Sequence, residues 1–489
     1  MKETPDSERL GIRSRWLRCV CYGFVVVAVV RNAIEQSLPW FGPNAVQHSR
    51  DIAASVWDYR LILSALRKCP TFPSTLIWWH GMWAHDEVPF WRPLTSLGFW
   101  LELHAFGADR FDRWQLVSFF SHLLFVLLLA LFVQRMSRSW GIAALTALLF
   151  AGNWNEWVSW LTSAPGLIAG LLSHVPASRM VVEALLRVQG LILGLLPTVP
   201  SNYVVSGWVY QQEFWVGWFE FGALICSVNG FWGATVACVG LSICCKESGW
   251  LCFPQIFAAI LTSGRPLRVP WRPAIAMAVV VVILIALRVA AGPEVLRGYH
   301  IGQNINWWTR WSIQALGAYF NIVLSPNAGL AILAALIFFL IIWKRQGLLL
   351  NFGLLLGGLV VCVAIHAKLN QMDFAMAFDA MFDPADRLSY LLKSLLWLGL
   401  FYPLLLDVEL RRKALSPLVM AMIQSTPLLE SGQVVTHNYY LITCFQCWLV
   451  ALAVTAFARR VVNTLPDRVR RWFIMDDALR IHPPDRARS

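Results

Sequence analysis

Residues 116–134 read LVSFFSHLLFVLLLALFVQ, without one Asp, Glu, Lys or Arg. A run of roughly 20 apolar residues is long enough to cross the hydrocarbon core of a bilayer as a helix. Comparable runs recur along the 489-residue chain, which is 58% hydrophobic and 14% charged. Soluble domains are about half apolar and about a quarter charged. The sequence therefore predicts an all-α polytopic membrane protein.

Clusters of basic residues between the apolar runs predict which side of the membrane each connection occupies. Short loops rich in Lys and Arg stay in the cytoplasm. Placing Arg135 with Arg138, Arg459 with Arg460 and the other clusters there gives a consistent alternation with both termini inside. The expected spans, about twelve in all, are 19–35, 116–134, 140–153, 212–228, 232–245, 250–262, 273–291, 328–343, 348–366, 388–406, 414–429 and 438–457.

The same pattern predicts the domain organisation. Residues 1–18 form a basic cytoplasmic N-terminus, and residues 19–460 form one integral membrane domain with a first outer loop at about 38–113. An apolar insert at about 165–205 is either a re-entrant hairpin or two further spans, which would raise the total to about fourteen. Residues 461–489 form an Arg-rich cytoplasmic tail on anionic lipid, so the net charge of +12 does not indicate nucleic-acid binding.

The large first outer loop contains two stretches with the spacing of amphipathic helices. Residues 52–66 are one, and residues 94–106, with Leu97, Trp100 and His104 at helical spacing, are the other. Helices with an apolar and a polar face lie in the membrane interface. We therefore expect interfacial helices in this loop.

Ionisable residues gather on the predicted outer side, and they indicate a chemistry. A carboxylate can act as a general base on an acceptor hydroxyl or amine. Lys and Arg can bind a lipid phosphate and stabilise the charge that builds on it as it leaves. Together they suit sugar transfer from a polyprenyl-phosphate donor, although solvated loop charges are the structural alternative. The cations Arg92, Lys246 and Arg387 lie on that side, together with acidic residues that include Asp58, Asp86 and Glu87.

Several short motifs resemble the GT-C superfamily of membrane glycosyltransferases, in the branch of the protein O-mannosyltransferases and the TMTC-like proteins. The first is the run from Phe90 to Trp100, which contains Arg92-Pro93-Leu94-Thr95 and precedes a Phe-Gly pair and His122. Later motifs follow in the same order along the chain. They are Glu156 with Trp160, Lys246-Glu247-Ser248-Gly249, and Arg387 with Tyr390.

This resemblance implies a GT-C-like bundle with an outer-face cavity that takes a sugar from a polyprenyl-phosphate carrier to a protein or glycan acceptor. It implies a catalytic base in the first outer loop, which leaves Asp58 and the Asp86-Glu87 pair as alternatives. It also implies that Lys246 faces the lipid phosphate. Supporting roles fall to Glu156, Glu247, His122 and Tyr390, and no cofactor other than the lipid-linked donor is implied.

The chain also departs from the family pattern. Asp58 stands alone where family members carry paired acidic residues, and Asn153 and Asn155 replace a His-rich element. A noncatalytic membrane subunit of the same fold therefore remains an alternative. A transporter or lipid flippase is another, but it favours ionisable residues near mid-membrane and inverted repeats, and we find few such charges and no clear repeat. His122, inside a span, is also suited to an interhelical hydrogen bond.

Two further expectations concern metal binding and location. The acidic stretch with Asp373, Asp379, Asp383 and Asp386 leaves a divalent metal open, although its spacing matches no known cage. We expect a multi-pass protein of a bacterial inner membrane, in contact with membrane lipid and with a lipid-linked sugar.

Overall fold

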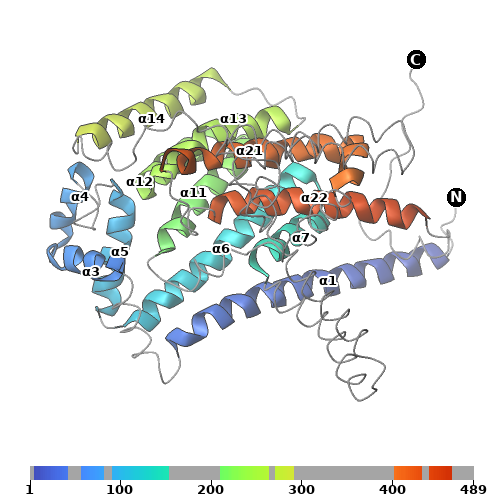
Figure 1. Ribbon diagram of the computed structural model, residues 1–489, viewed down its shortest axis with the longest axis horizontal. Coiled ribbons are helices and arrows are strands. Elements are labelled where there is room, and N and C mark those ends of the chain that lie inside the picture. The colour runs from blue at the N-terminus through green and yellow to red at the C-terminus, as the bar shows by residue number, and fades with distance from the viewer. Residues whose placement is uncertain are drawn as a thin grey trace, which may run out of the picture. The chain divides into compact units, whose positions relative to one another are not determined.

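The computed structural model (Figure 1) describes residues 5–41, 57–81, 91–108, 110–152, 210–263, 270–290, 401–431 and 440–464. The chain divides into two compact units. The first comprises Met1–Gly152, Pro200–Gln303 and Asp407–Ser489, and the second comprises Asn153–Val199 and Asn304–Leu406. Only residues 401–406 of the second unit are described, so the fold given below is that of the first unit.

Every regular element in the described part of the chain is a helix, as the sequence predicts. Three short 3-10 helices, labelled η, lie between α-helices in the described part of the chain. The elements are α1 (Pro5–Ser37), η1 (Leu38–Trp40), α3 (Trp57–Arg67), η2 (Phe72–Leu76), α4 (Ile77–His80), α5 (Pro93–Phe106), α6 (Phe111–Ser137), α7 (Trp140–Ala151), α11 (Gln211–Val228), α12 (Trp232–Cys245), η5 (Glu247–Leu251), α13 (Cys252–Thr262), α14 (Trp271–Ala290), α21 (Val408–Ser431) and α22 (Tyr440–Thr464).

Each predicted span that lies mostly within the described residues is helical. The span predicted at 232–245 coincides with α12, and the spans predicted at 116–134 and 414–429 are extended at both ends in α6 and α21. Both stretches predicted to be amphipathic helices in the first outer loop are helical, in α3 and α5, but only α3 has distinct apolar and polar faces. The prediction of an amphipathic helix is therefore wrong for α5, which buries polar and apolar side chains together. The spans predicted at 328–343 and 348–366, most of 388–406, and the insert at about 165–205 lie outside the described residues.

Four helical segments of the described chain are long and apolar enough to cross a membrane. They are Cys19–Ser37, Phe111–Ser137, Trp271–Ala290 and Tyr440–Arg460. Shorter apolar helices accompany them at Trp140–Ala151, Trp232–Cys245 and Ser248–Thr262. Helix α11 belongs to neither group, and it carries two carboxylates, Glu213 and Glu220, in an otherwise largely apolar sequence.

Contacts between helix ends establish the directions in which the helices run. The Gln115 side chain, at the start of α6, donates to Ser37 Oγ at the end of α1 over 3.3 Å, so these two helices are antiparallel. Asn32, near the end of α1, donates to the carbonyl of Ala151 at the end of α7. Helices α1 and α7 therefore run in the same direction, opposite to α6, as the predicted alternation requires.

The two ends of this bundle differ in the charges that they hold. At one end, Lys246 after α12 contacts Glu213 at the start of α11. At the other, Arg459 near the end of α22 pairs with Asp407 at 2.8 Å and Glu409 at 3.2 Å, beside the start of α21. We call these the Lys246 end and the Arg459 end.

Helix α11 packs against α6, α12 and α13, and aromatic side chains fill the space between α11, α6, α7 and α22. The Phe125 ring centroid lies 5.6 Å from that of Phe150 and 5.0 Å from that of Tyr440. Phe214 lies 5.4 Å from Tyr440. The close approach of α11 to α6 depends on Gly217, because a Cβ at that position would lie 2.1 Å from Cε2 of Phe125.

Helix α5 begins and ends at residues suited to those positions. Pro93 is its first residue, where the missing N–H costs no hydrogen bond. Gly107 follows its last residue with φ +86°, a conformation that glycine adopts without strain. The helix packs against α12 and α3, and its buried side chains include the polar Thr95, Ser96 and Glu102.

Candidate functional site

The first residues of α11 form a buried polar segment. Gln211, Gln212 and Glu213 are all buried, although they begin a helix whose remainder is mostly apolar. Buried polar groups are costly without partners. These three side chains receive theirs from α5, α6 and the end of α12, so the segment brings distant parts of the chain together.

Arg92 is the contact that α5 provides. Arg92 immediately precedes the helix, whose first residue is Pro93, and the Arg92 side chain is buried. Its guanidinium Nη1 donates to Oε1 of Gln212 over 2.6 Å. The adjacent Thr95 hydroxyl donates to the carbonyl of Cys245 over 2.6 Å, which ties α5 to the end of α12.

Lys246 connects the end of α12 to the buried polar segment of α11. It follows the last residue of the helix, and its buried ammonium forms an ion pair with Glu213. The turn after it folds back on α12, where the Ser242 hydroxyl donates to the carbonyl of Gly249 over 2.9 Å. A Cβ at Gly249 would lie 2.1 Å from the Ser242 carbonyl oxygen. The glycine of the Lys-Glu-Ser-Gly motif is therefore required for the fold of this turn.

His122 and Tyr440 link α6 to α22 at the same end of the bundle. Nδ1 of His122 lies 2.9 Å from the Tyr440 hydroxyl, and both side chains are fully buried. The imidazole also packs against Phe214, the neighbour of Glu213, with 5.5 Å between ring centroids. His122 thus makes the interhelical hydrogen bond that was one of its two expected uses.

Glu220 lies two turns further along α11 than Glu213, and its carboxylate is 1% exposed. Neither carboxylate oxygen has a hydrogen-bond partner of good geometry among the described residues. Its neighbours are Glu213, Lys246 and Gln424, and Gln424 in turn accepts a hydrogen bond from Gln255. Ionisable side chains therefore extend from the Lys246 end into the interior of the bundle.

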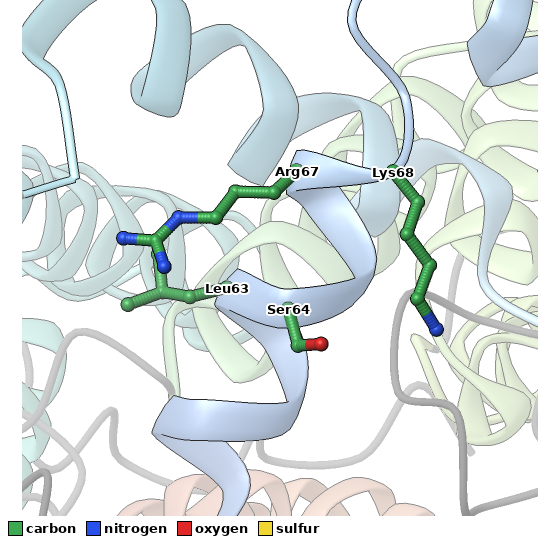
Figure 2. Close-up of a pocket in the computed structure, with 4 residues that line it drawn as sticks. All are labelled: Leu63, Ser64, Arg67 and Lys68. Atoms are coloured by element: carbon green, nitrogen blue, oxygen red, sulfur yellow. The ribbon is translucent and has the colours of Figure 1, made fainter.

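A pocket of about 420 Å³ lies beside α3 and is lined by Leu63, Ser64, Arg67 and Lys68. Figure 2 shows that the Arg67 and Lys68 side chains point in different directions, and both residues are exposed. The two cations that line this pocket therefore do not converge on one point. The buried group around Gln212, Glu213 and Lys246 is therefore the candidate site.

The structure brings some of the predicted site residues together and leaves others undescribed. Arg92 and Lys246 contact consecutive residues of α11. Asp58 is the second residue of α3, which packs on α5, although its side chain is outside the described part. Glu247 begins η5, and its side chain is likewise outside the described part. The remaining candidates lie outside the described residues: Asp86, Glu87, Glu156, Arg387 and Tyr390.

No model of a known protein family, no curated protein and no solved structure matches this chain. Among the described residues, no three His, Cys, Asp or Glu side chains are grouped so that they could bind a metal ion. The predicted acidic stretch at Asp373–Asp386 lies outside those residues.

The sequence interpretation missed Glu213 and Glu220, which it had placed inside the span 212–228 without assigning them a role. A signal was available, because residues seven apart lie on the same face of a helix. The two carboxylates have that spacing, and Gln212 precedes the first of them. The few ionisable residues inside the predicted spans thus include two buried carboxyls on α11.

Glu102 is a third buried carboxyl, on α5. Burial raises its pKa well above the ordinary value of 4.5, and the hydrogen bond that it accepts from Gln211 over 3.3 Å lowers it by less. Gln211 also donates to the carbonyl of Trp114 over 2.8 Å. Glu102 therefore binds a proton more tightly in the folded protein than in the unfolded chain.

Replacing Glu102 with glutamine is expected to remove a pH-dependent loss of stability. A carboxyl with a raised pKa destabilises the fold progressively as the pH rises above its unfolded-state value, and each pKa unit corresponds to about 1.4 kcal/mol. Thermal unfolding in detergent should show Glu102→Gln more stable than wild type at pH 8 and equal to it at pH 4. Equal pH profiles for the two proteins would contradict the assignment.

Proposed function

We propose that this chain is a multi-pass membrane glycosyltransferase of GT-C type that binds a polyprenyl-phosphate sugar at the Lys246 end of the bundle. We propose further that this end faces the outside of a bacterial inner membrane. The helix bundle, with four segments that could cross a membrane, is compatible with such an enzyme. The sugar would pass to a protein or glycan acceptor.

The observation that carries the proposal is the convergence of Arg92 and Lys246. They lie far apart in the sequence, yet they bind Gln212 and Glu213. Two cations at one end of a helix bundle are suited to a lipid phosphate, because Arg presents paired donors and Lys contributes a compact charge. In the structure Nη1 of Arg92 donates to the Gln212 amide, next to the ion pair of Lys246 with Glu213.

The first outer loop would supply the general base. Asp58 belongs to α3, which packs against α5, and the residue before α5 is Arg92. The helix that carries Asp58 therefore packs on the helix that Arg92 precedes. Asp86 and Glu87 remain the alternative bases, since they precede Arg92 in the same loop.

Loss of the two cations is expected to abolish binding of a phosphate-bearing lipid. Removing Lys246 alone would leave Glu213 buried without its partner, so the neutral pair Glu213→Gln/Lys246→Met is the better variant. Mass spectrometry of lipids that co-purify in mild detergent should detect a polyprenyl phosphate, or its glycosylated form, with the wild type. The double variant and Arg92→Gln should lose it.

The control for this experiment is Lys413→Ala, which removes a cation that pairs with Glu409 at the other end of the bundle. It should retain the lipid. Equal amounts of bulk phospholipid and no polyprenyl lipid in all four proteins would contradict the proposal. Transfer of the sugar to acceptor in vitro by the wild type, and its loss in Asp58→Asn, would test the chemistry separately.

A transporter or lipid flippase is the second candidate function, and Glu220 favours it. Ionisable residues within a membrane bundle mark ion and proton pathways in transporters. Glu220 is buried two turns inside α11 and forms no ion pair with any described cation. Flux of a polyprenyl-phosphate lipid across proteoliposomes without sugar transfer would support this function instead.

A further inference from the structure

Three helices contribute polar side chains to one place in the interior of the bundle. Glu220 comes from α11, Gln255 from α13 and Gln424 from α21. All three residues are buried, with exposures of 1%, 0% and 4%. The Gln255 amide donates to Oε1 of Gln424, and Gln424 lies beside the Glu220 carboxyl. We call these residues the Glu220 cluster.

The cluster has unused hydrogen-bonding capacity. Both carboxylate oxygens of Glu220 and the Oε1 atom of Gln255 are buried without a partner among the described residues. An ionised carboxylate accepts hydrogen bonds and donates none, whereas a protonated one can donate to an amide oxygen. A proton on Glu220 would therefore supply a donor within the cluster, beside Gln424, where Oε1 of Gln255 has no donor among the described residues.

The charges nearby do not neutralise an ionised Glu220. Among the described residues, the cation that acts on Glu220 is Lys246, and its ammonium forms an ion pair with Glu213. With Glu213 and Lys246 cancelling one another, an ionised Glu220 would leave one uncompensated negative charge inside the protein, which is strongly unfavourable. The other titratable groups that face this part of α11 are His122 of α6, Cys238 of α12, Cys252 of α13, and Tyr440 and Cys444 of α22.

We propose that the Glu220 cluster is a proton-binding site, in which the Glu220 carboxyl holds one proton and donates it in a hydrogen bond to an amide oxygen of Gln424 or Gln255. The inference does not depend on the proposed sugar transfer. It adds a proton-linked step to whichever function the Lys246 end performs.

The proton on Glu220 is coupled to the Glu213–Lys246 ion pair. When Glu220 releases its proton to water, the oxygen keeps the electron pair and a second carboxylate then competes with Glu213 for the single ammonium of Lys246. The ion pair that joins α11 to α12 would weaken in that state. Binding or release of one proton thus changes how firmly Lys246 is held, and Lys246 is the cation proposed to bind the lipid phosphate.

Infrared spectroscopy of the full-length protein at neutral pH tests the protonation directly. A protonated carboxyl and a carboxylate absorb at separate frequencies, so a Glu→Gln difference spectrum shows which form is lost. Glu220→Gln should lose protonated-carboxyl intensity equal to one group. Glu213→Gln, on the same helix, should lose carboxylate intensity instead. Loss of carboxylate intensity in Glu220→Gln would overturn the proposal.

The thermal stability of the same two variants gives an independent readout. Glutamine has nearly the shape of a protonated glutamic acid, and both side chains are uncharged. Glu220→Gln should therefore unfold at the wild-type temperature. Glu213→Gln should unfold at a lower temperature, because Lys246 then lacks its carboxylate. If Glu220→Gln fails to fold, or loses as much stability as Glu213→Gln, then Glu220 is an ionised partner of Lys246 and the proposal is wrong.

Discussion

Lys246→Met is expected to lower the free energy of unfolding by about 3–5 kcal/mol, which is the usual loss when one member of a buried ion pair is removed. Lys246 and Glu213 are both buried, with side-chain exposures of 8% and 2%. Water cannot replace the missing ammonium at such a site. The Glu213 carboxylate would remain in the interior without its cation.

The double variant Glu213→Gln/Lys246→Met should recover most of that loss. Replacing both members of a buried pair by neutral groups of similar size is often close to neutral, because neither charge is then buried. Thermal or denaturant unfolding in detergent of the wild type, both single variants and the double variant gives the coupling energy of the pair. Additive effects of the two single changes would contradict a direct ion pair.

An exposed ion pair on α21 provides the control. Lys413 pairs with Glu409 four residues earlier at 2.6 Å, and the two side chains are 25% and 47% exposed. Exposed pairs of this kind contribute about 0–1 kcal/mol. Lys413→Met should therefore change stability far less than Lys246→Met.

Gly217→Leu is expected to lower the free energy of unfolding by about 3 kcal/mol or more. Overpacking a core usually costs about 1–3 kcal/mol, and this site has no space for a side chain. The Cβ atom alone, before the rest of the leucine side chain is considered, would lie 2.1 Å from Cε2 of Phe125 and 3.2 Å from Cδ2 of Leu441. The Phe125 ring has little space to move, because it packs against Phe150, Phe221 and Tyr440. Helices α6 and α11 would have to separate.

Two other helical glycines serve as matched controls for this change. At Gly222, on the same helix, a Cβ would lie 3.4 Å from the Cys238 sulfur, and at Gly233 on α12 nothing lies within 4 Å. Alanine at either position should be neutral or stabilise the helix by up to about 1 kcal/mol. Unfolding temperatures of Gly217→Leu, Gly217→Ala, Gly222→Ala and Gly233→Ala would show the difference, and both changes at Gly217 should lower the temperature because both add the Cβ atom. Similar values for the three alanine variants would contradict the close packing at Gly217.

Much of the helical fold was predictable from the sequence because it depends on local properties. Apolar runs favour helices in which every backbone N–H and C=O is satisfied within the segment. The predicted spans at 116–134 and 232–245 accordingly match α6 and α12 closely. Pro93 and Gly107 mark the limits of α5 by their backbone preferences.

The candidate site was only partly predictable, because its contacts cross long distances in the sequence. Arg92 and Lys246 could be selected as charged residues on one side of the membrane, but nothing local indicated that they bind neighbouring residues of α11. The Arg92–Gln212 hydrogen bond joins positions 120 residues apart, and the His122–Tyr440 hydrogen bond joins positions 318 apart. Such pairings depend on which helices pack together.

The sequence by itself determined that this chain is helical and rich in segments apolar enough for a membrane, since composition and the length of apolar runs decide both properties. The tertiary structure alone decided the partners of its buried charges. Side-chain packing, as at Gly217 against Phe125, sets how closely α11 approaches its neighbours. That approach places Glu213 against Lys246 and leaves Glu220 without an ion pair among the described residues. A local sequence pattern does not specify such long-range distances.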